Sequence, residues 1–396
     1  MNPLAVYVHI PFCTIKCGYC DFNAYAGMDA LKAAYADAVV REVATWAPEL
    51  ARHTVTSIAF GGGTPGEQPA HDLGRIIDAI REVAPIAPDA EISLEANPGT
   101  ANDRQFRALR GAGIGRLSLG AQSFHEHELR FLDRIHSPEA IAGSVRLAHA
   151  AGIENLNLDL IYGLPASSVD SWLESVRDAL ALAPDHLSLY ALTVEEGTPL
   201  GAAVAAGSVE VPGPDEVADQ YEAASELLAE HGFEQYEISN WARPGHQSRH
   251  NRTYWEYGEY LGLGAGAHGF FEGERYENVA HPRGYIEAVG SGHGAVLDRY
   301  SPDTRTAIVD WLSLRLRLIE GFHRLEFKGQ FRIDIDAALG EPLGAALSAG
   351  VLQYEGGRLR LSGRGRLLHG ELVARALAHL TAHPDLLNGV VMAARC

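Results

Sequence analysis

Short apolar runs alternate with helical patterns through the first half of the chain. Six runs have the composition of strands, at residues 4–10, 55–60, 91–94, 116–119, 155–161 and 186–192, and helical spacing begins near residues 29, 69, 101, 137 and 168. Repeated strand–helix units give a parallel sheet covered by helices. The run 4–10 is almost continuously apolar, as in strands buried on both faces. We therefore predict an α/β fold, an open or partial (β/α)6 barrel.

The rhythm stops near residue 290. Helical patterns follow at 302–318, 335–349 and 365–382, with a hairpin at 352–362 that turns at Glu355-Gly356-Gly357. These elements predict a winged-helix-like α+β domain, and we divide the chain into a barrel (1–240), a connecting segment (241–295) and a C-terminal accessory domain (296–396). Four arginines give this domain a basic flank, which we interpret as a solvated face: Arg358, Arg360, Arg364 and Arg366.

Composition narrows the class of protein. Of the 396 residues, 46% are hydrophobic and 21% charged, which indicates a globular protein. The 51 acidic against 32 basic residues give a net charge of −19, which disfavours nonspecific nucleic-acid binding. No segment reaches the roughly 18–20 apolar residues of a membrane span, and residues 1–20 lack a basic signal-peptide start, so we expect a cytoplasmic protein.

Three of the four cysteines lie close together, at Cys13, Cys17 and Cys20, on a loop that follows the first predicted strand. In a reducing compartment, clustered thiols are typical of metal binding or catalysis, and three thiolates suit an iron–sulfur cluster or zinc. The cluster is the favoured interpretation. Zinc with His9 as a further ligand, a redox pair of Cys17 and Cys20, and plain packing are the alternatives; Cys396 carries no such signal.

Polar and glycine-rich segments follow the other predicted strands. They are Gly61 to Pro65, Glu95 to Pro98, Gly120 to Ser123 and Asp159 to Pro165. Because the carboxyl ends of parallel strands meet at one end of a barrel, we expect these segments and the cysteine loop to form a single site there.

The Cys-x3-Cys-x2-Cys spacing, followed by Gly61-Gly62-Gly63-Thr64-Pro65, resembles the radical S-adenosylmethionine (SAM) superfamily. More narrowly, residues 7–20, 157–165 and the C-terminal domain resemble the oxygen-independent coproporphyrinogen III oxidase family and its haem chaperone (HemW) branch. The resemblance implies a radical SAM barrel, a [4Fe–4S] cluster on the three cysteines, and SAM at its open iron. The residues that match cofactor-contacting positions are Tyr7, Tyr19, Gly62, Gly63, Thr64, Glu95, Gln122, Arg134 and Asp159.

Two features favour the chaperone branch over the oxidase. Phe22 stands where the oxidases carry a fourth cysteine, and the oxidase-type extension before Tyr7 is missing. The run from His250 to Trp255 resembles the His-Asn-x-x-Tyr-Trp signature of the haem-binding relatives. Because imidazole is a common haem ligand, His250 is the first choice of haem ligand, with His246 and His268 as substitutes.

The resemblance thus predicts a protein that binds a cluster, SAM and haem and delivers haem to an acceptor protein, with a membrane as one place of delivery. A reductant for the cluster is a further expected partner, no specific nucleic acid is expected, and a homodimer is left open. Two other functions remain: oxidative decarboxylation of coproporphyrinogen III in porphyrin biosynthesis, and an iron–sulfur winged-helix regulator.

Overall fold

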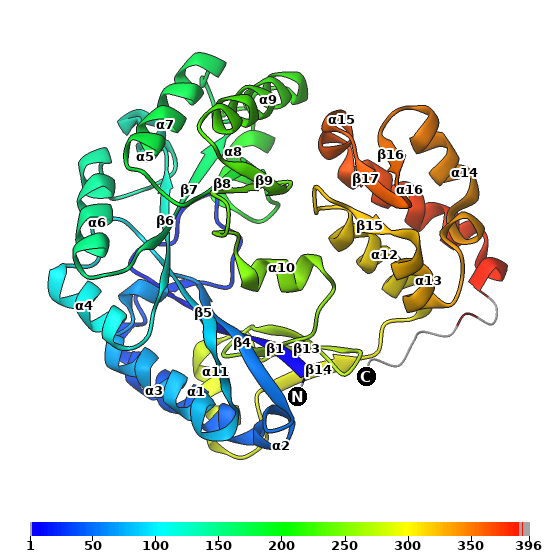
Figure 1. Ribbon diagram of the computed structural model, residues 1–396. Coiled ribbons are helices and arrows are strands. Elements are labelled where there is room, and N and C mark those ends of the chain that lie inside the picture. Colours follow the sequence, from blue (N-terminus) through cyan, green and yellow to red (C-terminus); the bar gives the residue numbers. More distant parts are fainter. Residues whose placement is uncertain (1, 388–389, 391–396) are drawn as a thin grey trace.

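A twelve-stranded sheet forms the frame of the molecule (Figure 1), and the computed structural model describes residues 2–387 and 390. Six central strands are parallel and neighbour one another in sequence order: β1 (Asn2–Ile10), β4 (His53–Gly62), β5 (Ile86–Ala96), β6 (Arg116–Gln122), β7 (Asn155–Tyr162) and β8 (His186–Ala191). The six predicted strands and the α/β class are confirmed.

Helices cover the outer face of the curved sheet (Figure 1). They are α1 (Lys32–Thr45), α2 (Ala47–Leu50), α3 (Ala70–Val83), α4 (Asp103–Gly111), α5 (Glu126–Phe131), α6 (Pro138–Ala150), α7 (Val169–Ala181), α9 (Pro214–Glu230) and α11 (Pro282–Gly290). The short helix α8 (Pro199–Ala205) instead begins beside the cysteine loop, where the Leu200 N–H donates to the Gly18 carbonyl. In α3 the apolar side chains Leu73, Ile76, Ile77 and Ile80 recur on one face and are fully buried. Ser137 and Ser168 cap α6 and α7 by accepting backbone hydrogen bonds.

Alternate residues of the parallel strands face the inside of the barrel, which is polar. Leu94, Leu117 and Leu158 pack outward in the core shared with the helices. The residues between them include Ser118 and Asn157, which hydrogen-bond across the lumen face at 2.6 Å. The strand alternation therefore separates an apolar outer layer from a hydrophilic interior.

Short strands extend the sheet at both edges. At one edge β11 (Tyr260–Leu263) pairs parallel with β1, and β12 (His268–Phe271), β13 (Glu274–Asn278) and β14 (Val296–Tyr300) follow antiparallel. At the other edge lie β10 (Asn240–Ala242) and β9 (Glu234–Glu237). The segment 241–295, which we expected to be a connection, thus contributes strands to the barrel sheet; the division at residue 240 stays a prediction.

The C-terminal residues form a second core beside the barrel (Figure 1). Its elements are α12 (Thr304–Arg315), β15 (Phe322–His323), α13 (Arg324–Phe331), α14 (Ile335–Ser348), β16 (Leu352–Glu355), β17 (Arg358–Leu361), α15 (Gly363–Leu367) and α16 (His369–Ala382). The hairpin turns where the sequence predicts it. The order helix, strand, two helices and hairpin is that of a winged helix, and β15 and α13 were not predicted.

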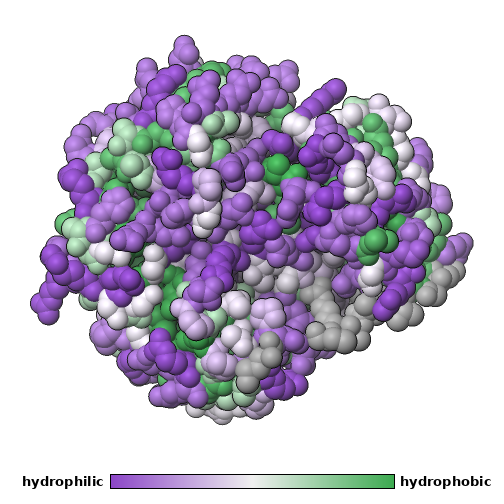
Figure 2. Space-filling model, in the orientation of Figure 1, coloured by the Kyte–Doolittle hydropathy of each residue, from purple (hydrophilic) through white to green (hydrophobic). Residues whose placement is uncertain are grey.

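Hydrophilic side chains dominate the molecular face in Figure 2, as the net charge of −19 leads one to expect.

The basic flank of the C-terminal domain is largely engaged within the molecule. Arg360 pairs with Glu355, Arg366 donates to Gln235, and Arg358 donates to the carbonyls of Glu320 and Gly321. Across the described residues, no helix combines the length and apolarity needed to cross a membrane.

Candidate cluster and cofactor site

The three cysteines lie on one loop at the carboxyl end of β1. The loop is bounded by two short paired strands, β2 (Phe12–Cys13) and β3 (Tyr25–Ala26). All three thiols are free and partly exposed. Thiolates on a single loop are the donor set of iron–sulfur clusters, so the residues present fit such a group.

The zinc interpretation required His9 as a further metal ligand, but the His9 ring is not free to bind a metal. Its Nδ1 lies 3.0 Å from the hydroxyl of Tyr7 and its Nε2 lies 2.9 Å from the carbonyl of Asn23. Both ring nitrogens are therefore already engaged.

A polar chain joins the cysteine loop to three strand ends. Arg134 donates to Cys17 Sγ at 3.7 Å and to the carbonyl of Gly120 at 2.8 Å, and it also bonds the side-chain oxygen of Asn97. Asn97 in turn donates to Thr64 Oγ1 at 3.1 Å, and Thr64 donates to Cys13 Sγ at 3.4 Å. The guanidinium and the hydroxyl thus hold two of the three sulfurs against the barrel. Asn97, at the centre of this chain, lies in the expected segment Glu95 to Pro98 but was not predicted as a contact residue.

The glycine segment after β4 makes room for close approach. A Cβ on Gly61 would lie 2.9 Å from the Tyr7 ring and 3.1 Å from Glu95 Oε1. Gly62 has φ +110°, and a Cβ there would lie 2.4 Å from the His9 ring. Glycine is required at both positions, by space at Gly61 and by backbone conformation as well at Gly62. The backbone N–H of Gly62 donates to Glu95 Oε2 at 3.3 Å.

Two carboxylates face the lumen below this segment. Glu95 is exposed to solvent in the open lumen, but the protein around its carboxylate removes part of its hydration. This desolvation raises the pKa of Glu95 to about 7, and the negative charge of Asp159 makes a smaller contribution in the same direction. Burial also raises the pKa of Asp159, opposed by hydrogen bonds from Ser118 Oγ and Asn157 Nδ2, each 2.8 Å long. Carboxylates in this position suit the hydroxyl and cationic groups of a nucleoside-like ligand.

The remaining predicted residues lie at the same end of the barrel. A Cβ on Gly120 would lie 2.8 Å from both Arg134 and the Gln122 amide, and Gln122 itself adopts φ +66°. Burial raises the pKa of Tyr19, on which Arg134, Cys17 and Asp159 act electrostatically. The structure therefore brings together the residues predicted for cluster and SAM contact; their individual roles remain predictions.

His250 lies on α10 (Arg249–Trp255), within the arc of the sheet (Figure 1), with its ring centroid 6.4 Å from that of Tyr7. It is 2% exposed, its Nδ1 lies 2.9 Å from Ser57 Oγ and its Nε2 lies 2.7 Å from the Tyr254 hydroxyl. Burial lowers the pKa of His250 to about 3, so the ring is neutral. Iron ligation by His250 would require one of these hydrogen bonds to break and the side chain to become accessible.

The comparisons with known proteins agree with this geometry. Residues 7–179 match the family model described as the radical SAM superfamily. The haem chaperone HemW of Mycobacterium tuberculosis is 39% identical over 380 residues, 95% of each chain, and the HemW of Escherichia coli is 36% identical over 83% of this chain and 86% of its own. The chain belongs to the HemW family of radical SAM proteins. Its fold is similar to that of coproporphyrinogen III oxidase from Escherichia coli, with a TM-score of 0.82 and 23% identity over 96% of this chain and 91% of that one.

Proposed function

We propose that this chain is a haem chaperone that carries a [4Fe–4S] cluster on Cys13, Cys17 and Cys20, binds SAM at the same end of the barrel, and delivers haem to an acceptor protein. The observation that carries the proposal is the 39% identity over 95% of both chains with a haem chaperone. The free thiols and the glycine segment beside Glu95 support the cofactor part.

When bound, the cluster would supply one-electron chemistry and an iron with an open position for the amino and carboxylate groups of SAM. The chain's own residues would hold the cluster and orient the ligand. Arg134 and Thr64 hold the sulfurs of Cys17 and Cys13. Because Gly61 and Gly62 have no side chain, a ligand can approach their backbone closely. With a pKa of about 7, Glu95 can act as either donor or acceptor to a ligand hydroxyl near neutral pH.

Haem delivery requires partners outside this chain. In this proposal a haem-accepting protein takes up the cargo, with a membrane as one place of delivery, and a separate reductant supplies electrons to the cluster; a homodimer is left open. The likeness to the oxidase shows the fold alone, because the identity is 23%.

An anaerobic haem titration tests the function. Protein reconstituted with iron and sulfide is titrated with haem, and we expect a saturable change in the Soret band, followed by its loss when a haem-free acceptor is added. An unchanged Soret band would overturn the proposal. SAM-dependent decarboxylation of coproporphyrinogen III in the presence of a reductant would instead support the oxidase function.

A further inference from the structure

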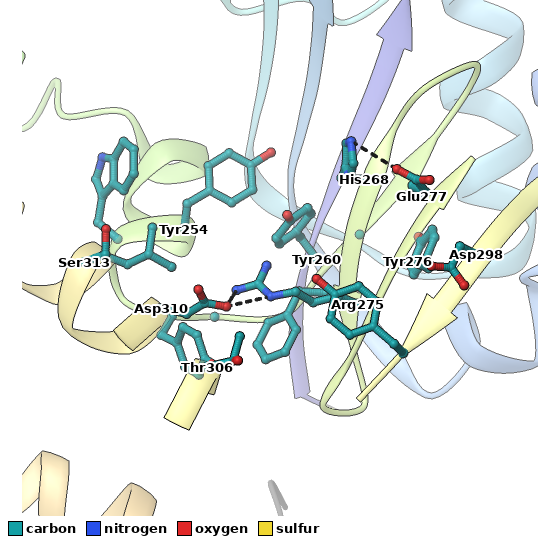
Figure 3. Close-up of a pocket in the computed structure, with 17 residues that line it drawn as sticks. Tyr254, Tyr260, His268, Arg275, Tyr276, Glu277, Asp298, Thr306, Asp310 and Ser313 are labelled. Atoms are coloured by element: carbon teal, nitrogen blue, oxygen red, sulfur yellow. Dashed lines mark hydrogen bonds and ion pairs between the residues drawn. The ribbon is translucent and has the colours of Figure 1, made fainter. Parts of the chain in front are cut away.

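A large cavity lies between the added sheet edge and the C-terminal domain (Figure 3). It encloses about 680 Å³, within the roughly 300–1,000 Å³ common for small-molecule sites. One wall is formed by β11 to β14, and the other by α10, the loop after it and α12. The cysteine loop, Glu95, Asp159 and His250 are not among its lining residues, so the groups proposed to hold the cluster, SAM and haem lie outside it.

Antiparallel pairing places two rows of side chains across the sheet wall of the cavity. In the first row, Arg275 on β13 stands opposite Phe270 on β12 and Tyr300 on β14. The Arg275 guanidinium lies 5.0 Å from the centre of the Phe270 ring and forms a 2.7 Å ion pair with Asp310 on α12 (Figure 3). In this cavity an aromatic face and a carboxylate therefore already hold one planar cation, which belongs to the chain itself.

In the second row, two carboxylates stand opposite each other. Glu277 on β13 pairs across the strands with Asp298 on β14 and, on its other side, with His268 on β12. Within the described residues, neither carboxylate is paired with a lysine or arginine side chain; His268 Nε2 lies 4.0 Å from Glu277 Oε2, and Asp298 accepts the backbone N–H of Arg299. Like charges directly opposite each other destabilise an antiparallel pair. A cation bound between these carboxylates would remove that repulsion.

The charge of the whole lining has the same sign. The lining contains three carboxylates against one guanidinium. Because Asp310 pairs with Arg275, the negative charges of Glu277 and Asp298 are left without compensation in the cavity wall. The lining therefore attracts cations and repels anions.

An organic cation fits this space better than a metal ion does. Across the part of the chain that the structure describes, no three His, Cys, Asp or Glu side chains come together closely enough to hold a metal ion. The cavity instead offers aromatic surface: Tyr254 and Tyr260 stand edge to face with ring centroids 4.6 Å apart, and Tyr300, 51% exposed, lines the same space. Aromatic faces attract ammonium and guanidinium groups and cover the apolar parts of a ligand.

We propose that this cavity binds a small organic cation. The carboxylates of Glu277 and Asp298 would pair with its ammonium, amidinium or guanidinium group, and the rings of Tyr254, Tyr260 and Tyr300 would cover its apolar body. The inference does not depend on the haem-carrying function, because none of the residues proposed to bind the cluster, SAM or haem takes part in it.

Calorimetric titration of the reconstituted protein with benzamidine tests the site. Benzamidine is a flat amidinium cation, and benzamide is a neutral molecule of nearly the same shape. We expect saturable binding of benzamidine that weakens as salt is added, and at least about tenfold weaker binding of benzamide, which cannot form a charge-assisted pair with the carboxylates. Equal affinity for the two molecules, or no binding of benzamidine, would overturn the inference.

Two variants assign the binding to this cavity. Asp298→Asn removes one carboxylate and should bind benzamidine about two- to fivefold more weakly, without a fall in melting temperature because the opposed charge is gone. Tyr300→Ala removes an exposed ring and should weaken binding by a similar factor. Asp178→Asn, an exposed position on the outer helix α7, is the control and should bind as the wild type does.

Wild-type affinity in both Asp298→Asn and Tyr300→Ala would exclude this cavity as the cation site. Haem and SAM are absent from these titrations, so their outcome bears on the cavity alone. Failure of the haem titration described above would count against the proposed function and leave the cation site standing.

Discussion

Glu42 is a carboxylate in the apolar core, 1% exposed, that ties α1 to the added sheet edge. It accepts hydrogen bonds from Asn278 Nδ2 and the Gly264 backbone N–H, each 2.7 Å, and from the Tyr285 hydroxyl at 2.5 Å. Burial nevertheless outweighs these bonds and raises the pKa of Glu42 from its ordinary 4.5 to about 7. The folded state therefore holds this proton over a pH range in which the unfolded chain has lost it.

The raised pKa predicts a loss of stability as the pH rises from about 4.5 to about 7. Glu42→Gln cannot ionise, so its unfolding free energy should fall less over that range, by up to about 3 kcal/mol in the difference. Denaturant unfolding of both proteins at several pH values measures this. Parallel pH profiles for the two would contradict the assigned pKa.

Arg134 contacts a predicted cluster sulfur and two strand-end groups. Outer partners of metal ligands contribute about 10–100-fold in metal affinity, so Arg134→Gln should lose iron to a chelator at least about tenfold more readily. Arg107→Gln is the control, because Arg107 forms an exposed ion pair with Asp103 one turn earlier on α4, away from the cysteine loop. Equal iron retention in the two variants would remove Arg134 from the site.

At the scale of elements, α10 connects the barrel interior to the wall of a cavity lined by Tyr254, Tyr260 and Phe270. The hydroxyl of Ser57 on β4 forms a hydrogen bond with His250 Nδ1, and the hydroxyl of Tyr254 forms one with His250 Nε2. We expect His250→Ala to lower the unfolding free energy by about 2 kcal/mol, because the buried hydroxyl of Ser57 and the partly buried hydroxyl of Tyr254 each lose a partner. Thermal denaturation measures the loss; His246→Ala, with a 39% exposed side chain, should cost less. An unchanged melting temperature in His250→Ala would contradict this positioning role.

The sequence analysis predicted the six long apolar strands, and it missed the short strands that extend the sheet as well as the 17-residue helix α9. Residues 4–10 are apolar throughout and lie in β1. By contrast β11 and β12 have four residues each, and glycines lie within or between them at Gly262, Gly264 and Gly266. Gly262 permits close strand approach, since a Cβ there would lie 1.9 Å from the His268 carbonyl oxygen. Such a requirement appears only when two distant backbones are placed together.

The candidate site divides in the same way. Cysteine spacing and strand-end position were enough to predict that the cysteine loop and Glu95 lie at one end of the barrel, whereas Arg134 was predicted from the family resemblance. The cavity beside Tyr254 could not be predicted from the sequence. Its walls come from α10, β11 to β14 and α12, and no sequence spacing relates these segments. His250 was preferred over His268 on its motif alone, and only burial and hydrogen bonding distinguish the two.

Over the whole molecule, the cysteine loop and the cavity lined by Tyr254, Tyr260 and Phe270 stand on the same sheet. β1 leads into the cysteine loop and pairs with β11, which forms part of the cavity wall. The C-terminal domain closes the cavity through α12 and the Arg275–Asp310 ion pair.

The central claim, a cluster on the amino-terminal cysteine loop, is tested most directly by iron and acid-labile sulfide analysis after oxygen-free reconstitution. A [4Fe–4S] cluster predicts about four of each per chain, falling sharply in Cys17→Ser. Absence of iron and sulfide from the wild type, or an unchanged content in Cys17→Ser, would contradict the claim.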